Sequence, residues 1–204
     1  MHILFVHGLG ASPIWGAPLL FRLRKAGHST SNFSYMVSRH DFETIKKRLM
    51  KTIENIAQQG EYALVGHSLG GILLRAAVLD LAPEVRRPAK LFLLGSPVTS
   101  TLGSRILKDC FLYRLLARDC GQLVSTQRRM KAIGVPPVET ICIIGTRGRY
   151  GRFSPFGTAS NDGMVQEKEL CAERFSHAVK VDASHSFLAF SREVAHCAIE
   201  HLAR

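Results

Sequence analysis

One glycine-rich segment, GHSLGG at residues 66–71, constrains the fold of this chain more than any other feature. A short apolar run over residues 62–65 precedes it, and residues 72–79 follow with the spacing of a helix. Where a buried strand passes directly into a helix, side chains beside the turn collide. Gly66 and Gly70 have no Cβ atom, so they leave room for such a turn. The segment predicts a strand–turn–helix unit with Ser68 exposed at its apex.

The rest of the chain alternates between short apolar runs and longer amphipathic segments. We expect strands over residues 2–6, 28–36, 62–65, 90–94, 140–144 and 178–182, and helices over 13–26, 41–59, 68–81, 103–117 and 186–203. Asp41 or Ser38 is suited to cap the second helix. The alternation predicts an α/β fold of three layers, with a mostly parallel sheet of about six strands and helices on both faces.

Length and composition fit one globular domain over residues 1–204, with 46% apolar and 21% charged residues. No apolar stretch is long enough to cross a membrane. The first residues, MHILFVHG, lack the features of a secretory signal, so we expect a cytoplasmic protein.

The cysteines predict neither disulfide bonds nor a zinc site. They are odd in number, far apart and without a CxxC pair: Cys110, Cys120, Cys142, Cys171 and Cys197. Cys142 lies in an apolar run and is expected to be a small buried side chain.

The net charge of +11 favours acidic partners. The basic residues are dispersed along the chain, and no nucleic-acid-binding motif accompanies them, so no nucleic acid partner is expected. Two interpretations stay open: solvated helix surfaces, or transient contact with an anionic membrane surface.

The pattern G-x-S-x-G between a strand and a helix is that of a nucleophile elbow, with Ser68 as the nucleophile. The N-terminus of the following helix favours negative charge near the serine, and the Leu69 amide can bind an oxyanion. The segment VHGLG after the first strand offers a second amide donor at Leu9. A glycine-rich turn with a capping serine is the alternative interpretation of residues 66–71.

His185 has the position that a general base for Ser68 requires. It follows the last expected strand and precedes the last helix, so it lies above the same edge of the sheet as the serine. The chain contains 9 histidines. Of the others, His7 and His67 are expected to shape the backbone beside the elbow, and the remaining six to lie on surfaces or in turns.

Asp162 is the candidate acid that orients His185. It lies in the long segment between the last two strands, which gives the chain order Ser68, Asp162, His185. A simple Asx turn at Asp162, which precedes a glycine, is the alternative. The rival acids are Glu167 and Glu169, whose spacing suggests a helix surface, and Asp109 and Asp119, which are expected away from this edge.

With these segments in place, nearly the whole chain resembles the α/β-hydrolase superfamily, and within it the small lipase- and esterase-like members. The similar segments are VHGLG, GHSLGG, LFLLGSPVTSTLGS, SNDGMV and SHSF, in that order. The resemblance implies Ser68 as nucleophile, His185 as base and Asp162 as acid, with the amides of Leu9 and Leu69 as oxyanion hole.

The chain departs from larger members of the superfamily in two respects. It begins at the strand that carries HGLG, without leading antiparallel strands, and it has no large cap insertion. Residues 99–137 are short and helical, and they form either a small lid or helices packed into the core.

The resemblance implies hydrolysis of carboxylic esters through an acyl-enzyme, with a small-molecule or lipid-like ester as substrate and no metal or organic cofactor. Phe153 and Phe156 are candidate walls of the acyl site, and Arg147, Arg149 and Arg152 are candidates to favour an anionic headgroup. A thioesterase, a lipid-linked deacylase, and a non-catalytic interaction protein on the same fold are the alternatives.

Overall fold

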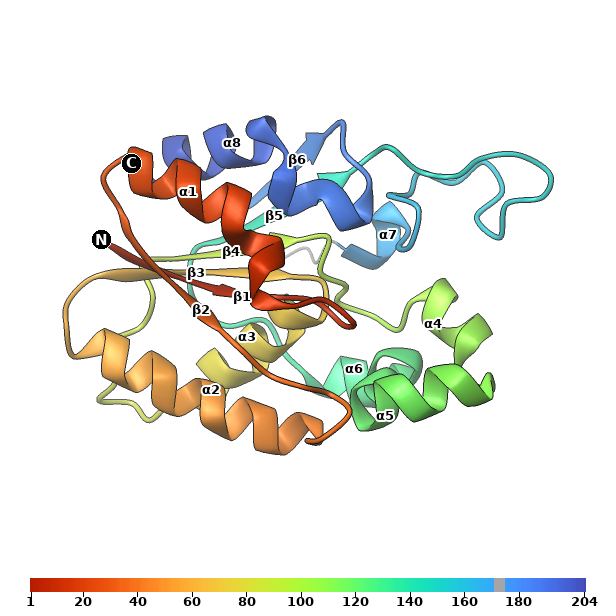
Figure 1. The fold of residues 1–204 in the computed structure, drawn as a ribbon, viewed down its shortest axis with the longest axis horizontal. Helices are drawn as coiled ribbons and strands as arrows, with labels where there is room; N and C mark the ends of the chain where they lie inside the picture. The colour runs from red at the N-terminus through yellow and green to blue at the C-terminus, as the bar shows by residue number, and fades with distance from the viewer. Residues whose placement is uncertain (171–174) are drawn as a thin grey trace.

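A computed structural model of the chain describes residues 1–170 and 175–204, apart from the side chain of residue 112. Cys171 lies outside the described residues. The strands are β1 (His2–Val6), β2 (Ser29–Phe33), β3 (Tyr62–His67), β4 (Lys90–Leu94), β5 (Thr140–Gly145) and β6 (His177–Val181). They form one parallel sheet in the order β2–β1–β3–β4–β5–β6, which confirms the predicted α/β fold (Figure 1).

Helices cover both faces of this sheet. They are η1 (Pro13–Gly16), α1 (Ala17–Lys25), α2 (Phe42–Ala57), α3 (Leu69–Asp80), α4 (Leu102–Leu107), α5 (Phe111–Ser125), α6 (Gln127–Ala132), α7 (Glu167–Leu170), η2 (His185–Phe190) and α8 (Arg192–Leu202). Figure 1 shows α1 and α8 on one face and α2 and α3 on the other, so the three predicted layers are present.

The alternation of side chains along each strand divides the core in two. In β1, Leu4 and Val6 pack towards α2 and α3, whereas Ile3 and Phe5 pack towards α1 and α8. The strands β3, β4 and β5 are buried along their whole length. Burial on both faces explains why these strands read as continuous apolar runs in the sequence.

Local capping sets where two of the predicted helices begin, and one of these starts differs from the expectation. The hydroxyl of Ser191 accepts a hydrogen bond from the Val194 amide at 3.4 Å, which starts α8 and separates it from η2. The second helix begins as predicted, since Asp41 accepts a hydrogen bond from the Thr44 amide at 2.7 Å.

The segment 99–137 differs most from the sequence prediction. It forms α4, α5 and α6 in place of one helix, and Arg118 breaks α5 with a φ of 44°. The interpretation of its apolar residues as core is wrong for five side chains, all of them exposed: Ile106, Leu107, Phe111, Leu115 and Leu116. The reason is position, because these side chains belong to α4 and the first half of α5, which project beyond one end of the sheet (Figure 1). In the second half of α5, Cys120 and Leu123 pack in the core with α2 and α3.

The described residues also give findings on membrane-spanning helices and on cysteines. No described helix combines the length and the apolar character that a membrane crossing needs. The four described cysteines are free thiols, and Cys142 is buried within β5.

The glycine at residue 70 provides a test of the packing beside the elbow. A Cβ atom there would overlap the carbonyl oxygen of Val6 in β1, whereas one at Gly134 would make ordinary contact with Leu79 at 3.4 Å. We expect Gly70→Ala to lower the free energy of unfolding by roughly 2–3 kcal/mol and Gly134→Ala to change it by less than about 0.5 kcal/mol. Urea unfolding measures both, and equal values for the two variants would contradict this packing.

Candidate active site

Ser68 occupies a strained turn between β3 and α3. Its φ of 51° lies in the left-handed region, which side chains other than glycine seldom adopt. A Cβ atom on Gly66 would overlap the backbone of Gly71, and one on Gly70 would overlap Val6. The steric role predicted for both glycines is therefore confirmed. Strain of this kind costs on the order of 1–3 kcal/mol, and it persists where surrounding packing enforces it.

The loop after β1 lies directly against this turn. A Cβ atom on Gly8 would stand 3.0 Å from Nδ1 of His67 and 3.1 Å from Cβ of Ser68. A side chain here would have to displace these neighbours, so glycine suits the close approach, and Leu9 of this loop lines the same cavity as Ser68. Leu69 begins α3, so its amide is one of the unpaired donors at a helix N-terminus.

Tyr35 fixes the loop after β1, a contact that the sequence did not reveal. Its hydroxyl donates a hydrogen bond to the carbonyl oxygen of His7 at 2.7 Å, and its ring stacks on the imidazole of His7 at 4.2 Å. The Nδ1–H of His7 in turn donates to the Gly8 carbonyl oxygen at 2.9 Å. His7 thus shapes the backbone, as expected, and Tyr35 shares this role.

Asp162 and His185 form a buried hydrogen-bonded pair. Nδ1 of His185 lies 2.6 Å from Oδ2 of Asp162, and the two residues are 5% and 1% exposed. The His185 amide also donates to the carbonyl oxygen of Asp162 at 2.8 Å. Because an ionised carboxylate only accepts hydrogen bonds, the proton of a neutral His185 lies on Nδ1, and Nε2 carries the lone pair.

The sequence allows two interpretations of Asp162, either as the acid that orients His185 or as part of an Asx turn, and each interpretation applies to a different oxygen of its carboxylate. Oδ1 accepts hydrogen bonds from the amides of Met164 at 3.0 Å and Val165 at 2.8 Å, which is an Asx-type turn. Oδ2 is left to hold His185. The turn therefore orients the carboxylate towards the histidine.

Gly95, directly after β4, makes room for this pair. Its φ is 54°, and a Cβ atom there would lie 3.0 Å from Nδ1 of His185 and 3.1 Å from Oδ2 of Asp162. Any side chain at this position would push the histidine and the carboxylate apart.

Ser68, His185, Leu9 and Leu69 all line one cavity of about 640 Å³. Phe156 also lines it, as predicted, but Phe153 does not: this side chain is 97% exposed at the tip of the loop before Asp162. Arg149 lines the cavity, whereas Arg147 is directed to Asp182 at 2.6 Å, and Arg152 is exposed outside the lining.

The rival acids have other partners or lie elsewhere. Asp119 pairs with Arg129 at 2.7 Å, Glu167 pairs with Lys180 at 2.7 Å, and Asp109 is exposed near Lys108. Of the candidate acids, Asp162 is the one whose carboxylate reaches His185.

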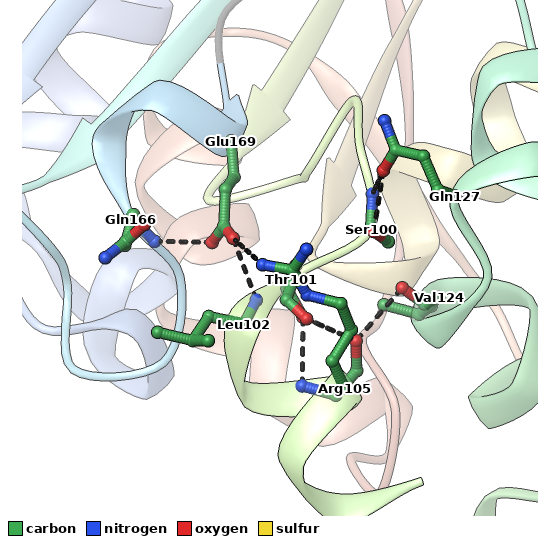
Figure 2. Close-up of polar contacts among 9 residues, drawn as sticks. Ser100, Thr101, Leu102, Arg105, Val124, Gln127, Gln166 and Glu169 are labelled. Carbon is green, nitrogen blue, oxygen red and sulfur yellow. Dashed lines mark hydrogen bonds and ion pairs between the residues drawn. The ribbon is translucent and has the colours of Figure 1, made fainter. Parts of the chain in front are cut away.

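Glu169 was expected on a surface, and that expectation is wrong. Its side chain is 4% exposed, and its two carboxylate oxygens accept hydrogen bonds from the amides of Leu102 at 2.8 Å and Gln166 at 2.9 Å (Figure 2). The Arg105 guanidinium lies 3.9 Å away. Figure 2 shows that this carboxylate bridges the segment after Asp162 to the first turn of α4. The short helix α7 carries it, so the helical spacing of Glu167 and Glu169 indicated a helix but not the burial of Glu169.

Further buried hydrogen bonds anchor the segment 99–137. The hydroxyl of Ser104 donates to the Val124 carbonyl oxygen at 3.0 Å, and that of Ser100 donates to Oε1 of Gln127 at 2.6 Å (Figure 2). Arg75 of α3 is buried and donates to the carbonyl oxygens of Pro97 and Ile133. Burial lowers the pKa of Arg75 to about 10. Arg75 was not singled out from the sequence, but its position as a lone charge within the apolar run 69–79 could have indicated a buried contact.

One group among the described residues has metal-ligand chemistry, namely Glu139, His177 and His201. It lies at the amino-terminal edge of the sheet, before β5 and at the start of β6, opposite the cavity. The Lys90 ammonium already contacts both carboxylate oxygens of Glu139, at 2.9 and 3.1 Å. This group is therefore separate from the candidate active site.

Comparison with solved structures gives many matches over the whole chain. A hydrolase of the alpha/beta superfamily from Xanthomonas campestris pv. campestris matches with a TM-score of 0.68 and 15% identity, over 99% of this chain and 98% of that one. A monoacylglycerol lipase from Paleococcus ferrophilus matches with a TM-score of 0.65 and 15% identity, over 98% and 93%. The thioesterase of the prodiginine pathway in Streptomyces coelicolor matches with a TM-score of 0.61 and 13% identity, over 99% and 88%.

No model of a protein family matches the chain, and no curated protein matches it either. The structural matches nevertheless agree with a parallel sheet surrounded by helices. The chain has the α/β-hydrolase fold.

His67 couples the elbow to His185 and is held neutral. Its Nε2–H donates to the carbonyl oxygen of His185 at 2.9 Å, and the two rings lie 5.0 Å apart. Burial, with a smaller effect from the neighbouring His185, lowers the pKa of His67 from 6.5 to about 3. His67 therefore supports the backbone of His185 and stays uncharged near neutral pH.

This pKa makes the fold sensitive to acid. Between pH 6.5 and about 3 the unfolded chain protonates His67 and the folded chain does not, so stability falls as the pH drops through this window. The comparison variant is His67→Gln, which keeps an N–H donor. Relative to this variant, we expect the free energy of unfolding of the wild type to fall by about 1.4 kcal/mol for each pH unit of acidification within this window. Urea unfolding at several pH values tests this, and parallel pH dependences would contradict a neutral buried His67.

Proposed function

We propose that this protein is a serine hydrolase that cleaves carboxylic esters. The observation that carries the proposal is the buried Asp162–His185 hydrogen bond of 2.6 Å beside the strained Ser68, in a cavity that both Ser68 and His185 line. An oriented imidazole that shares a cavity with a serine hydroxyl is the arrangement that serine nucleophiles require.

The proposed reaction has two steps. Nε2 of His185 takes the proton of the Ser68 hydroxyl as Oγ attacks the ester carbonyl carbon, and the imidazolium then protonates the departing alcohol. An acyl-serine remains, which water hydrolyses with His185 again as base, so the products are a carboxylic acid and free enzyme. Asp162 holds His185 with its proton on Nδ1 and stabilises the imidazolium.

The Leu9 and Leu69 amides are the proposed donors to the oxyanion. The close packing of Gly8 supports this role, since a Cβ atom added to Gly8 would stand 3.1 Å from Cβ of Ser68, so the loop after β1 lies against the elbow. Loss of one such donor typically costs about 100- to 1000-fold in rate.

The cavity supports an acyl chain as the bound group. Its volume of about 640 Å³ is typical of small-molecule sites, and side chains such as Ile72, Ile106, Leu107 and Phe156 contribute to its wall. Among the described residues that line the cavity, Arg149 alone has a lysine, arginine or acidic side chain, and it fits a polar or anionic end of the ester.

A thioester substrate is the second candidate. The similarity to the prodiginine thioesterase favours it, and the same serine and histidine can cleave either bond. Parallel assays with oxygen and sulfur esters of one acyl chain distinguish the two. A non-catalytic interaction protein is the remaining alternative, which turnover of any ester excludes.

Replacement of the nucleophile tests the proposal. The wild type should hydrolyse p-nitrophenyl esters and bind a fluorophosphonate probe covalently, and Ser68→Ala should lose labelling and at least about 10³-fold in kcat. The matched control is Ser186→Ala, because Ser186 lines the same cavity outside the proposed triad. Equal labelling of wild type and Ser68→Ala would refute the assignment.

The acid is tested by Asp162→Asn. The variant keeps an oxygen that can accept from Met164 and Val165, but its NH₂ group faces the histidine and favours the wrong tautomer. We expect kcat to fall roughly 10³- to 10⁴-fold with little change in KM. Asp119→Asn serves as control and should keep kcat within about threefold. A kcat for Asp162→Asn close to that of the control would remove Asp162 from the mechanism.

A further inference from the structure

Exposed apolar side chains are concentrated around the mouth of the cavity. Among the described residues, 13 large apolar side chains are exposed. Phe21, Met36 and Leu79 lie elsewhere in the sequence. Each of the other ten either lines the cavity or is at most three positions along the chain from a residue that lines it. Large apolar patches around a polar site mark an interaction surface.

Half of this group belongs to the helices beyond the end of the sheet. These side chains are Ile106 and Leu107 of α4 and Phe111, Leu115 and Leu116 of α5. Phe111 is 78% exposed. Within α5, Phe111, Leu115 and Leu116 have the spacing i, i+4 and i+5, so they lie on one side of this helix, and that side is exposed.

The other half comes from three separate segments around the same cavity. Ile14 belongs to η1, Phe187 belongs to η2, and Tyr150, Phe153 and Met164 belong to the long segment before and after Asp162. Figure 1 shows that this segment and α4–α5 project from the same end of the molecule. We call these ten side chains together the apolar rim.

Basic side chains accompany the apolar rim. Arg105, Lys108, Arg114 and Arg118 are exposed on or beside α4 and α5, and Arg149 and Arg152 are exposed beside Phe153. The described acidic residue exposed on the same helical segment is Asp109. The rim thus combines apolar and positively charged groups on a chain whose net charge is +11.

The buried anchors hold the rim outward. Glu169 fixes the first turn of α4, and Ser104 fixes α4 to the end of α5 through the Val124 carbonyl oxygen (Figure 2). Because the inner side of the helical segment is committed to these contacts, its outer apolar side chains remain exposed to the surroundings.

We propose that the apolar rim seats on an anionic lipid bilayer and opens the cavity to acyl chains in the membrane. Apolar side chains would enter the headgroup–acyl boundary, and the basic side chains would contact lipid phosphates. Uptake of an ester substrate from the bilayer rests on the proposed function. Binding of the apolar rim to the bilayer does not depend on it.

Charge and position favour a bilayer over other occupants. A second copy of this chain would bring two strongly positive molecules together, which their mutual repulsion opposes. A protein partner on the rim would cover the mouth of the cavity, whereas a bilayer supplies acyl chains at that mouth.

The test uses full-length protein with Ser68→Ala, so that no lipid is consumed, and vesicles of phosphatidylcholine with or without one third phosphatidylglycerol. We expect co-sedimentation with the anionic vesicles that weakens with salt. Phe111→Ser with Leu115→Ser should lower the partition coefficient roughly tenfold or more. The matched control, Phe21→Ser with Leu79→Ser, changes exposed apolar residues away from the rim and should have less than about a twofold effect.

The charge contribution has its own pair of variants. Lys108→Glu with Arg114→Glu should abolish the preference for anionic vesicles, and Lys47→Glu with Lys51→Glu on α2 should leave most of it. Absence of binding to any vesicle overturns the proposal. An equal loss of vesicle binding in the rim variants and the control variants also overturns it. A third contrary result is a concentration-dependent dimer that dissociates in the variant with Phe111→Ser and Leu115→Ser. Hydrolysis of a water-soluble ester by the wild type is measured in parallel. Hydrolysis without vesicle binding would overturn this proposal alone, whereas vesicle binding without hydrolysis would overturn the proposed function alone.

Discussion

The close contact of β3 and α3 at Ser68 is the constraint on which the candidate site depends. The turn has a left-handed φ at a serine, and it is compatible only with glycine at residues 66 and 70. Since all six strands are parallel, their carboxyl ends meet at one edge, and the turn reaches the segments that carry Asp162 and His185 there. Packing elsewhere in the sheet therefore maintains the strain at the serine.

Sequence reasoning identified the elements that local patterns specify. The turn at Ser68, the strands of the sheet and the order of Ser68, Asp162 and His185 all follow from short segments with a steric or hydrogen-bonding reason. The side chains of Tyr35 and Glu169 were missed, because their partners lie far away in the sequence and neither residue belongs to a recognisable motif. Phe153 was instead assigned to the cavity wall and lies outside the lining, because its exposure depends on the path of a long loop.

The apolar residues of α4 and α5 illustrate a limit of hydrophobic patterns. Helical periodicity reports that one side of a helix is apolar, but it does not report what that side faces. Here the buried polar groups of Glu169, Ser104 and Arg75 attach the segment to the domain, while leucine and phenylalanine side chains point outward. Buried polar contacts and exposed apolar side chains thus occur together beside the cavity, although Cys120, Leu123 and Met130 of the same segment pack in the core.

The proposed chemistry requires a covalent bond between substrate and Ser68. The direct measurement is to quench the hydrolysis of an activated ester with acid, determine the intact mass and map the modified peptide. Our account predicts one acyl group per chain on the peptide that contains Ser68, and none on that peptide in Ser68→Ala. Continued hydrolysis by Ser68→Ala at the wild-type rate, or an acyl group on a different residue that turns over, would contradict it.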